Sequence, residues 1–139
     1  MTARALAALA ALALAAGAPA VGKGSRSGVY SAAQADEGAR LYSVKCAMCH
    51  AARLEGTVET PALVGKFMAG WADAPLADLF DYLGRAMPQN APGSLSAQDN
   101  ARLVAFILQG NGAPAGDTPL PDDVSALRRI ILEAAEPQN

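Results

Sequence analysis

The residues whose side chains suggest a specific chemistry lie in one short run, Cys46-Ala47-Met48-Cys49-His50. Two cysteines three positions apart project from the same side of a helical turn. Their sulfurs can form thioethers with the two vinyl groups on one edge of a porphyrin, and the histidine that follows can reach the iron as an axial ligand. These are the only two cysteines and the only histidine among the 139 residues. The run therefore predicts one covalently attached haem c per chain.

Two other uses of a cysteine pair compete with this interpretation. A C-x-x-C pair can be a thiol redox site, but that site usually lies beside a βαβ unit, and the strand-like runs of such a unit do not occur in this sequence. A structural zinc site needs four ligands. Two cysteines and one histidine leave that set one short.

The second axial ligand decides what such a haem does, because an open site binds small molecules and a closed one mainly transfers electrons. With no second histidine, the methionines are the candidates. Met48 lies between the cysteines, and Met68 follows so soon that its segment must round the haem edge. Met87 comes after a complete predicted helix and before Pro88, which favours an extended backbone. We expect His50 and Met87 to bind the iron from opposite sides.

The sequence predicts a helix over residues 32–45 that leads into the haem motif. Ser31 is expected to cap it, with Gln34 as the partner in a capping box. Gly38 weakens a helix in its middle. Its presence makes sense if a second helix crosses closely at that point.

A loop is expected after the motif, over residues 51–60, and a short helical turn over residues 63–68. A metal-bound histidine normally donates its second N–H to a carbonyl or carboxylate, and a carbonyl near Pro61 is a candidate acceptor. Trp71, the only tryptophan, is a candidate to pack on the haem edge and donate its indole N–H to a propionate. A plain role as a core aromatic side chain is the alternative.

Three further helices are predicted. The first starts after Asp73 and Pro75 and buries residues at helical spacing, namely Leu76, Leu79, Phe80 and Leu83. The second is capped by Ser96 and ends at Gly110. A last helix begins after the acidic pair at 122–123 and carries an apolar face of Val124, Leu127, Ile131 and Ala134.

This order of features resembles the class I cytochromes c. The resemblance covers residues 32–110 and rests on Gly38, Tyr42, the haem motif, Pro61-Ala62-Leu63, Phe67, Trp71, Met87-Pro88 and Phe106. It implies an all-α fold of about four to five helices around one covalently bound haem, with the first and last helices of the domain crossing near the glycine. One departure is Ala51, where that family often has glycine.

A narrower resemblance is to the cytochrome domains that serve periplasmic dehydrogenases, especially pyrroloquinoline-quinone alcohol dehydrogenases. It rests on Trp71, Asp78-Leu79-Phe80, Met87-Pro88, residues 92–96, Asn111-Gly112 and residues 114–116. It implies a mono-haem electron carrier that is not itself an enzyme. Its redox partners would be a dehydrogenase donor and an oxidase or other acceptor. A haem enzyme or sensor with an open distal site, and an obligate subunit of a dehydrogenase complex, are the alternative functions.

Composition and the chain ends complete these expectations. A formal charge of −2 gives no electrostatic reason for nucleic-acid binding. Residues 1–20 resemble a secretory signal peptide, with Arg4, an apolar run and a small-x-small end. The expected organisation is this signal, a flexible lead-in over 21–30, a cytochrome c domain over 31–112, and a C-terminal extension with a short helix over 113–139. We expect a periplasmic protein with no membrane span after cleavage.

Overall fold

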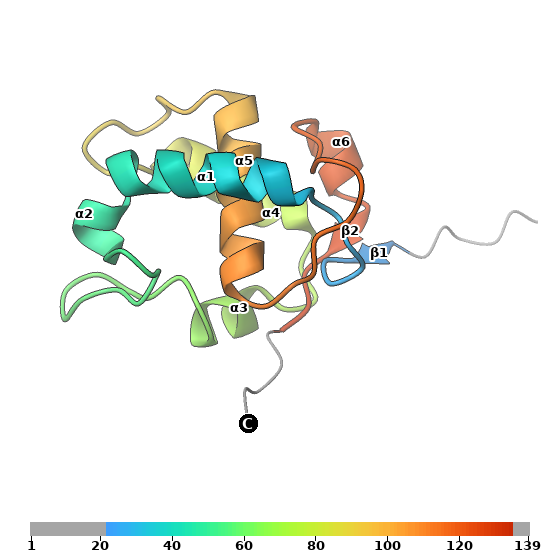
Figure 1. Cartoon of the computed structure of the whole chain (residues 1–139), viewed down its shortest axis with the longest axis horizontal. Coiled ribbons are helices and arrows are strands. Elements are labelled where there is room, and N and C mark those ends of the chain that lie inside the picture. Colours follow the sequence, from blue (N-terminus) through green and yellow to red (C-terminus); the bar gives the residue numbers. More distant parts are fainter. Residues whose placement is uncertain (1–21, 135–139) are drawn as a thin grey trace, which may run out of the picture.

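The computed structural model describes residues 22–134 and is mainly helical in that part of the chain (Figure 1). Its elements, in order, are β1 Lys23–Gly24, α1 Ala32–Lys45, α2 Ala47–His50, α3 Lys66–Trp71, α4 Leu76–Ala86, α5 Ala97–Gly110, α6 Val124–Leu127 and β2 Ile130–Ile131. The predicted all-α cytochrome fold is confirmed, although two of the six described helices are single turns. The predicted signal peptide, residues 1–20, lies outside the described residues. Among the described helices, none combines the length and apolar content needed to cross a bilayer.

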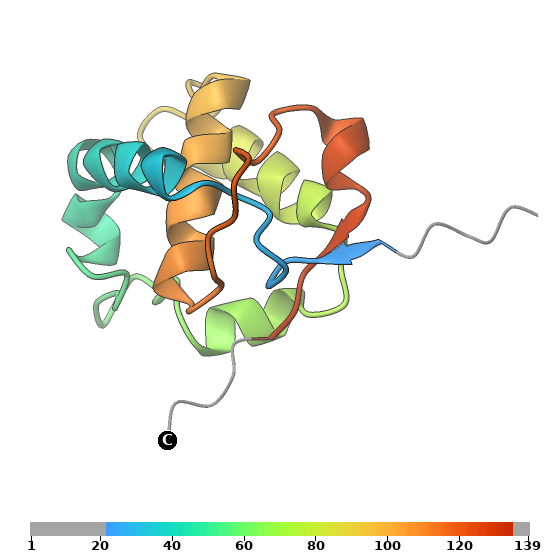
Figure 2. The same ribbon diagram turned by 45° about the vertical axis from the view of Figure 1, so that its right-hand side comes forward.

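The two longest helices, α1 and α5, cross each other, as both ribbon views show (Figures 1 and 2). Their closest backbone approach is at Gly38. A Cβ atom on Gly38 would collide with the backbone carbonyl of Arg102 and would approach Phe106. One turn further along α1, the ring of Tyr42 packs on Phe106 with centroids 5.2 Å apart. The predicted close approach of a second helix at Gly38 is therefore confirmed.

The core lies where α4 and α5 present their apolar faces. All four residues predicted for the buried face of α4 are buried, namely Leu76, Leu79, Phe80 and Leu83. On α5, Leu103 and Ile107 are buried. Phe106 is only partly buried, and its ring packs on Tyr42 of α1.

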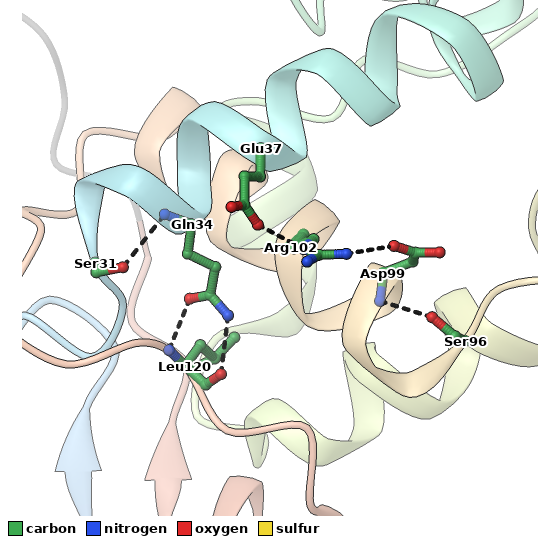
Figure 3. Close-up of polar contacts among 7 residues, drawn as sticks. All are labelled: Ser31, Gln34, Glu37, Ser96, Asp99, Arg102 and Leu120. Carbon is green, nitrogen blue, oxygen red and sulfur yellow. Dashed lines mark hydrogen bonds and ion pairs between the residues drawn. The ribbon is translucent and has the colours of Figure 1, made fainter.

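Helix caps follow the sequence pattern at α1 and α5. Ser31 Oγ accepts a hydrogen bond of 3.2 Å from Gln34 N, and Ser96 Oγ accepts one of 3.1 Å from Asp99 N. The other half of the predicted capping box is wrong, since the Gln34 side chain turns to a distant segment. It donates to Leu120 O at 2.9 Å and accepts from Leu120 N at 2.7 Å (Figure 3).

Charged side chains support the α1–α5 crossing on its exposed side. Arg102 Nε lies 2.7 Å from Glu37 Oε2 on α1, and Arg102 Nη1 lies 2.9 Å from Asp99 Oδ1 on the preceding turn of α5 (Figure 3). The same residue therefore contacts α1 through its side chain and through its backbone carbonyl at Gly38.

The start of α4 differs from the prediction. Pro75 occupies the N-cap position, and no side chain caps the helix. Asp73 instead has a positive φ of 66°, and its backbone N–H donates to Leu132 O at 2.9 Å. The C-terminal segment thus holds the corner between α3 and α4, which explains why this aspartate is not a cap.

The prediction for the last helix was wrong beyond its first turn. Asp123 caps α6 as expected, but α6 ends at Leu127, and Ile130–Ile131 pair in parallel with Lys23–Gly24 (Figure 2). The Leu132 N–H also donates to Ala74 O at 2.9 Å. These backbone partners favour an extended chain over continued helix.

The lead-in over 21–30 was predicted to be flexible, and residues 22–30 are instead packed. Besides forming β1, this segment buries the side chains of Ser25, Val29 and Tyr30. The Tyr30 hydroxyl donates to Ala113 O at 2.5 Å. The glycine and serine content indicated a flexible segment. The C-terminal strand that pairs with this segment is distant in the sequence, and the local pattern does not reveal it.

The crossing predicts the effect of adding a methyl group at Gly38. Gly38→Ala should lower the free energy of unfolding by about 1–3 kcal/mol, the usual cost of overpacking, and Gly38→Val should lower it further. The matched control is Gly70→Ala in α3, where a new Cβ would meet nothing within 4 Å. That change should be neutral or stabilising by up to about 1 kcal/mol. Denaturant unfolding followed by helical circular dichroism tests this, and equal small effects at both glycines would contradict it.

Candidate haem site

The residues expected to hold the haem, Cys46, Cys49 and His50, lie on one helical turn directly after α1, which we call the attachment turn. Cys46 ends α1 and precedes α2, and its carbonyl accepts hydrogen bonds from Cys49 N at 3.1 Å and His50 N at 2.9 Å. Cys49 is exposed and Cys46 is partly buried, whereas only 8% of His50 is exposed. The two sulfurs are therefore accessible for attachment while the imidazole is held within the fold.

The orientation of His50 is set by a backbone carbonyl. Its Nδ1 lies 2.9 Å from Pro61 O. Because a carbonyl only accepts, Nδ1 carries the proton and Nε2 is left as the nitrogen that can bind a metal. This is the acceptor that the sequence suggested, and it is the usual way in which proteins orient a metal-binding histidine.

The residue after the histidine has an unusual backbone. Ala51 has φ 61° and ψ 168°, a region that residues other than glycine rarely occupy. Its carbonyl accepts a hydrogen bond of 2.6 Å from the Tyr42 hydroxyl. Burial raises the pKa of Tyr42 to about 12, with Cys46 and Glu55 adding to the shift, so this phenol stays protonated and able to donate. The strain at Ala51 is thus offset by contacts from α1.

The methionines differ sharply in where they lie. Met87 is the C-cap of α4, with an extended backbone at φ −122° and ψ 152°, and its side chain is partly buried. Met68 is 1% exposed and belongs to the core, and Met48 is 85% exposed. The Met87–Pro88 peptide bond is cis. Of the three, Met87 alone is neither sealed in the core nor fully in solvent.

Trp71 ends α3 and belongs to a row of aromatic side chains. Its ring centroid lies 6.4 Å from that of Phe67 and 5.7 Å from that of Tyr82 on α4. The i, i+4 spacing of Phe67 and Trp71 in the sequence indicates that these two rings lie close together. No comparable spacing indicates the contact between Trp71 and Tyr82. A role for Trp71 at a haem edge stays a prediction.

The donor set fits a c-type haem better than its competitors. Burial raises the pKa of the Cys46 thiol, which disfavours the thiolate that disulfide exchange requires. Among the residues that the structure describes, no group of three or more His, Cys, Asp or Glu side chains could hold a metal ion. Several apolar side chains after the motif pack on the core but are only partly buried, and so are available to a large apolar group: Val64, Phe67, Trp71, Met87 and Leu95.

A small helical fold that presents this motif at the end of its first long helix defines a class I, mono-haem c-type cytochrome. The model of the family Cytochrome C oxidase, cbb3-type, subunit III matches residues 33–107, more than half of the chain. The chain belongs to this family. Such a domain carries haem c and transfers electrons.

A solved structure shows the same fold. The crystal structure of the sulfane dehydrogenase SoxCD from Paracoccus pantotrophus matches with a TM-score of 0.53 and 24% sequence identity, over 83% of this chain. The chain spans 61% of that SoxCD chain. No curated protein matches the sequence significantly.

The strained backbone after His50 predicts a stabilising substitution. Ala51→Gly should raise the free energy of unfolding by roughly 1 kcal/mol, because relief of an unfavourable backbone region exceeds the entropy that glycine loses. The control is Ala33→Gly, at an exposed helical position of α1, which should lower it by roughly 0.5–1 kcal/mol. Denaturant unfolding of the haem-loaded protein measures both. Destabilisation by both substitutions would show that Ala51 is unstrained.

Proposed function

We propose that this protein is an exported mono-haem electron carrier that passes single electrons from a dehydrogenase to a downstream acceptor. The observation that carries the proposal is the turn with Cys46, Cys49 and His50, in which Nδ1 of His50 is fixed 2.9 Å from the Pro61 carbonyl. The two cysteines would hold one haem covalently. When bound, that haem supplies an iron that alternates between the ferric and ferrous states by one electron.

Met87 is the distal ligand in this proposal. It follows the end of α4 with an extended backbone, and its side chain is partly buried. Met68 is sealed within the core, and Met48 is held on the attachment turn between the cysteines. A thioether favours the ferrous state and closes the iron to other ligands, which suits a carrier.

The transfer itself makes and breaks no bond in the partners. A reduced dehydrogenase loses one electron in one encounter, and the acceptor gains one electron in a second encounter. The region around the attachment turn exposes apolar side chains, with Met48 85% and Val44 81% exposed. With a formal charge of only −2 over the chain, a weak and partly hydrophobic contact is expected rather than strong electrostatic steering.

A dehydrogenase is the proposed donor on two grounds. The resemblance to cytochromes of pyrroloquinoline-quinone alcohol dehydrogenases implies it, and the similar SoxCD structure is named as a sulfane dehydrogenase. The periplasm is the proposed location because residues 1–20 resemble a signal peptide and bacterial haem c is attached outside the cytoplasm.

Covalent attachment is tested directly. Acid–acetone should fail to extract the haem, and the intact mass should equal that of the mature chain plus one haem, because thioethers survive this treatment. The control is Cys46→Ser with Cys49→Ser, which should accumulate little folded protein. Haem that extracts freely from the wild type would overturn the proposal.

The distal ligand is tested by exchanging the two candidate methionines in turn. Met87→Ala should remove the weak far-red band of ferric sulfur–iron haem, lower the reduction potential and allow carbon monoxide to bind, while the haem stays attached. Met68→Ala, the matched control, should destabilise the core by about 2–5 kcal/mol and leave the band in place.

The opposite pattern would assign the ligand to Met68 and leave the carrier function standing. A wild-type protein that lacks the band and binds carbon monoxide readily would have an open distal site. It would then be better described as a haem enzyme or sensor.

A further inference from the structure

The Asn111 side chain, just after α5, is buried and makes three hydrogen bonds. It is 6% exposed, and its Nδ2 donates to Leu63 O at 2.9 Å and to Ile107 O at 2.8 Å. Its Oδ1 accepts from Gly65 N at 2.9 Å. The amide orientation is determined by these partners, because reversing it would place the oxygen against two carbonyls. One side chain therefore joins the end of α5 to two backbone groups of the segment before α3.

That segment is the one that orients His50. Pro61, whose carbonyl accepts from Nδ1, lies two residues before Leu63. No regular element spans residues 51–65, so the position of this carbonyl depends on the bonds that anchor the loop. One anchor is internal, from Leu63 N to Leu54 O at 2.8 Å. The bonds from Asn111 tie the same stretch to α5.

We propose that Asn111 is a positioning residue for the axial histidine, holding the 61–65 segment against α5 so that the Pro61 carbonyl stays bonded to Nδ1 of His50. The inference rests on the proposed ligation of haem iron by His50. A firm acceptor at Nδ1 fixes the ring and raises the basicity of the other nitrogen. A loosened acceptor would let the ring N–H exchange with water and would make the histidine a weaker donor to iron.

The support for Asn111 continues into the N-terminal segment. The Arg26 guanidinium donates to Asn111 O at 3.4 Å and to Gly112 O at 3.1 Å. A cation at this place interacts favourably with the negative end of the α5 dipole, and its N–H groups bond to carbonyls at the end of the helix. Arg26 therefore bonds the backbone of the residue whose side chain bonds to the 61–65 segment.

A second buried asparagine on α5 provides a matched control. Asn100 is 3% exposed, and its Nδ2 donates to Phe80 O at 2.7 Å on α4. It contributes a buried hydrogen bond at the other end of the same helix and has no bond to the 61–65 segment. Asn100→Ala should therefore lower stability without freeing the Nδ1 proton of His50.

The test is solvent exchange of the His50 Nδ1–H, measured by ¹H–¹⁵N NMR on the reduced, haem-loaded protein. Asn111→Ala should accelerate this exchange by about tenfold or more relative to both wild type and Asn100→Ala, because local opening governs exchange. The reduction potential should rise in the same variant, since a less basic histidine stabilises ferric iron less. If Asn111→Ala does not accumulate with haem, Asn111→Ser is measured by the same criterion.

The outcomes are distinguishable. Exchange within about twofold of wild type in the Asn111 variant, with a melting temperature lowered as in Asn100→Ala, would reduce Asn111 to a structural role and overturn the inference. A wild-type protein in which His50 does not bind iron would instead overturn the proposed function. Accelerated exchange in the Asn111 variant alone supports the inference.

Discussion

The backbone contact between Gly38 and the Arg102 carbonyl is the constraint on which the rest of the structure depends. It places α1 and α5 against each other at one point with no side chain between them. The attachment turn follows directly from the end of α1, and Asn111 follows directly from the end of α5. Both sides of the candidate site are therefore positioned relative to the same crossing. A shift at Gly38 would move His50 relative to the loop that orients it.

Around His50 the chain uses backbone groups where many metal sites use carboxylates. Nδ1 meets the Pro61 carbonyl, the carbonyl of His50 accepts from Gly56 N at 2.9 Å, and Ala51 O accepts from Tyr42. No charged partner is needed to orient the ring. A carboxylate at Nδ1 would increase the donation of the imidazole to a metal, and a carbonyl orients the ring without adding a charge.

Sequence patterns predicted the local features well because the residues that cause them are neighbours. Ser31 and Ser96 cap helices through N–H groups three positions away, and the attachment motif acts within one turn. The long-range partners were missed. Gln34 and Leu120 are 86 residues apart, and nothing in the sequence around either residue indicates the other as its partner. Ile131 matches helical spacing from Val124, yet pairing with β1 makes it extended. Met87 and Trp71 as haem contacts stay predictions.

The terminal segments affect the candidate site through α5. Arg26 and Tyr30 bond to carbonyls between residues 111 and 113, at the same end of the helix from which Asn111 reaches the loop below His50. Both donors, and the carbonyls that they meet, lie outside residues 33–107, the part that matches the family. Parallel pairing of β1 with β2 holds the two terminal segments together. The hydrogen bonds of Arg26 and Tyr30 therefore stabilise the C-terminal end of α5, from which the Asn111 side chain bonds to the 61–65 segment.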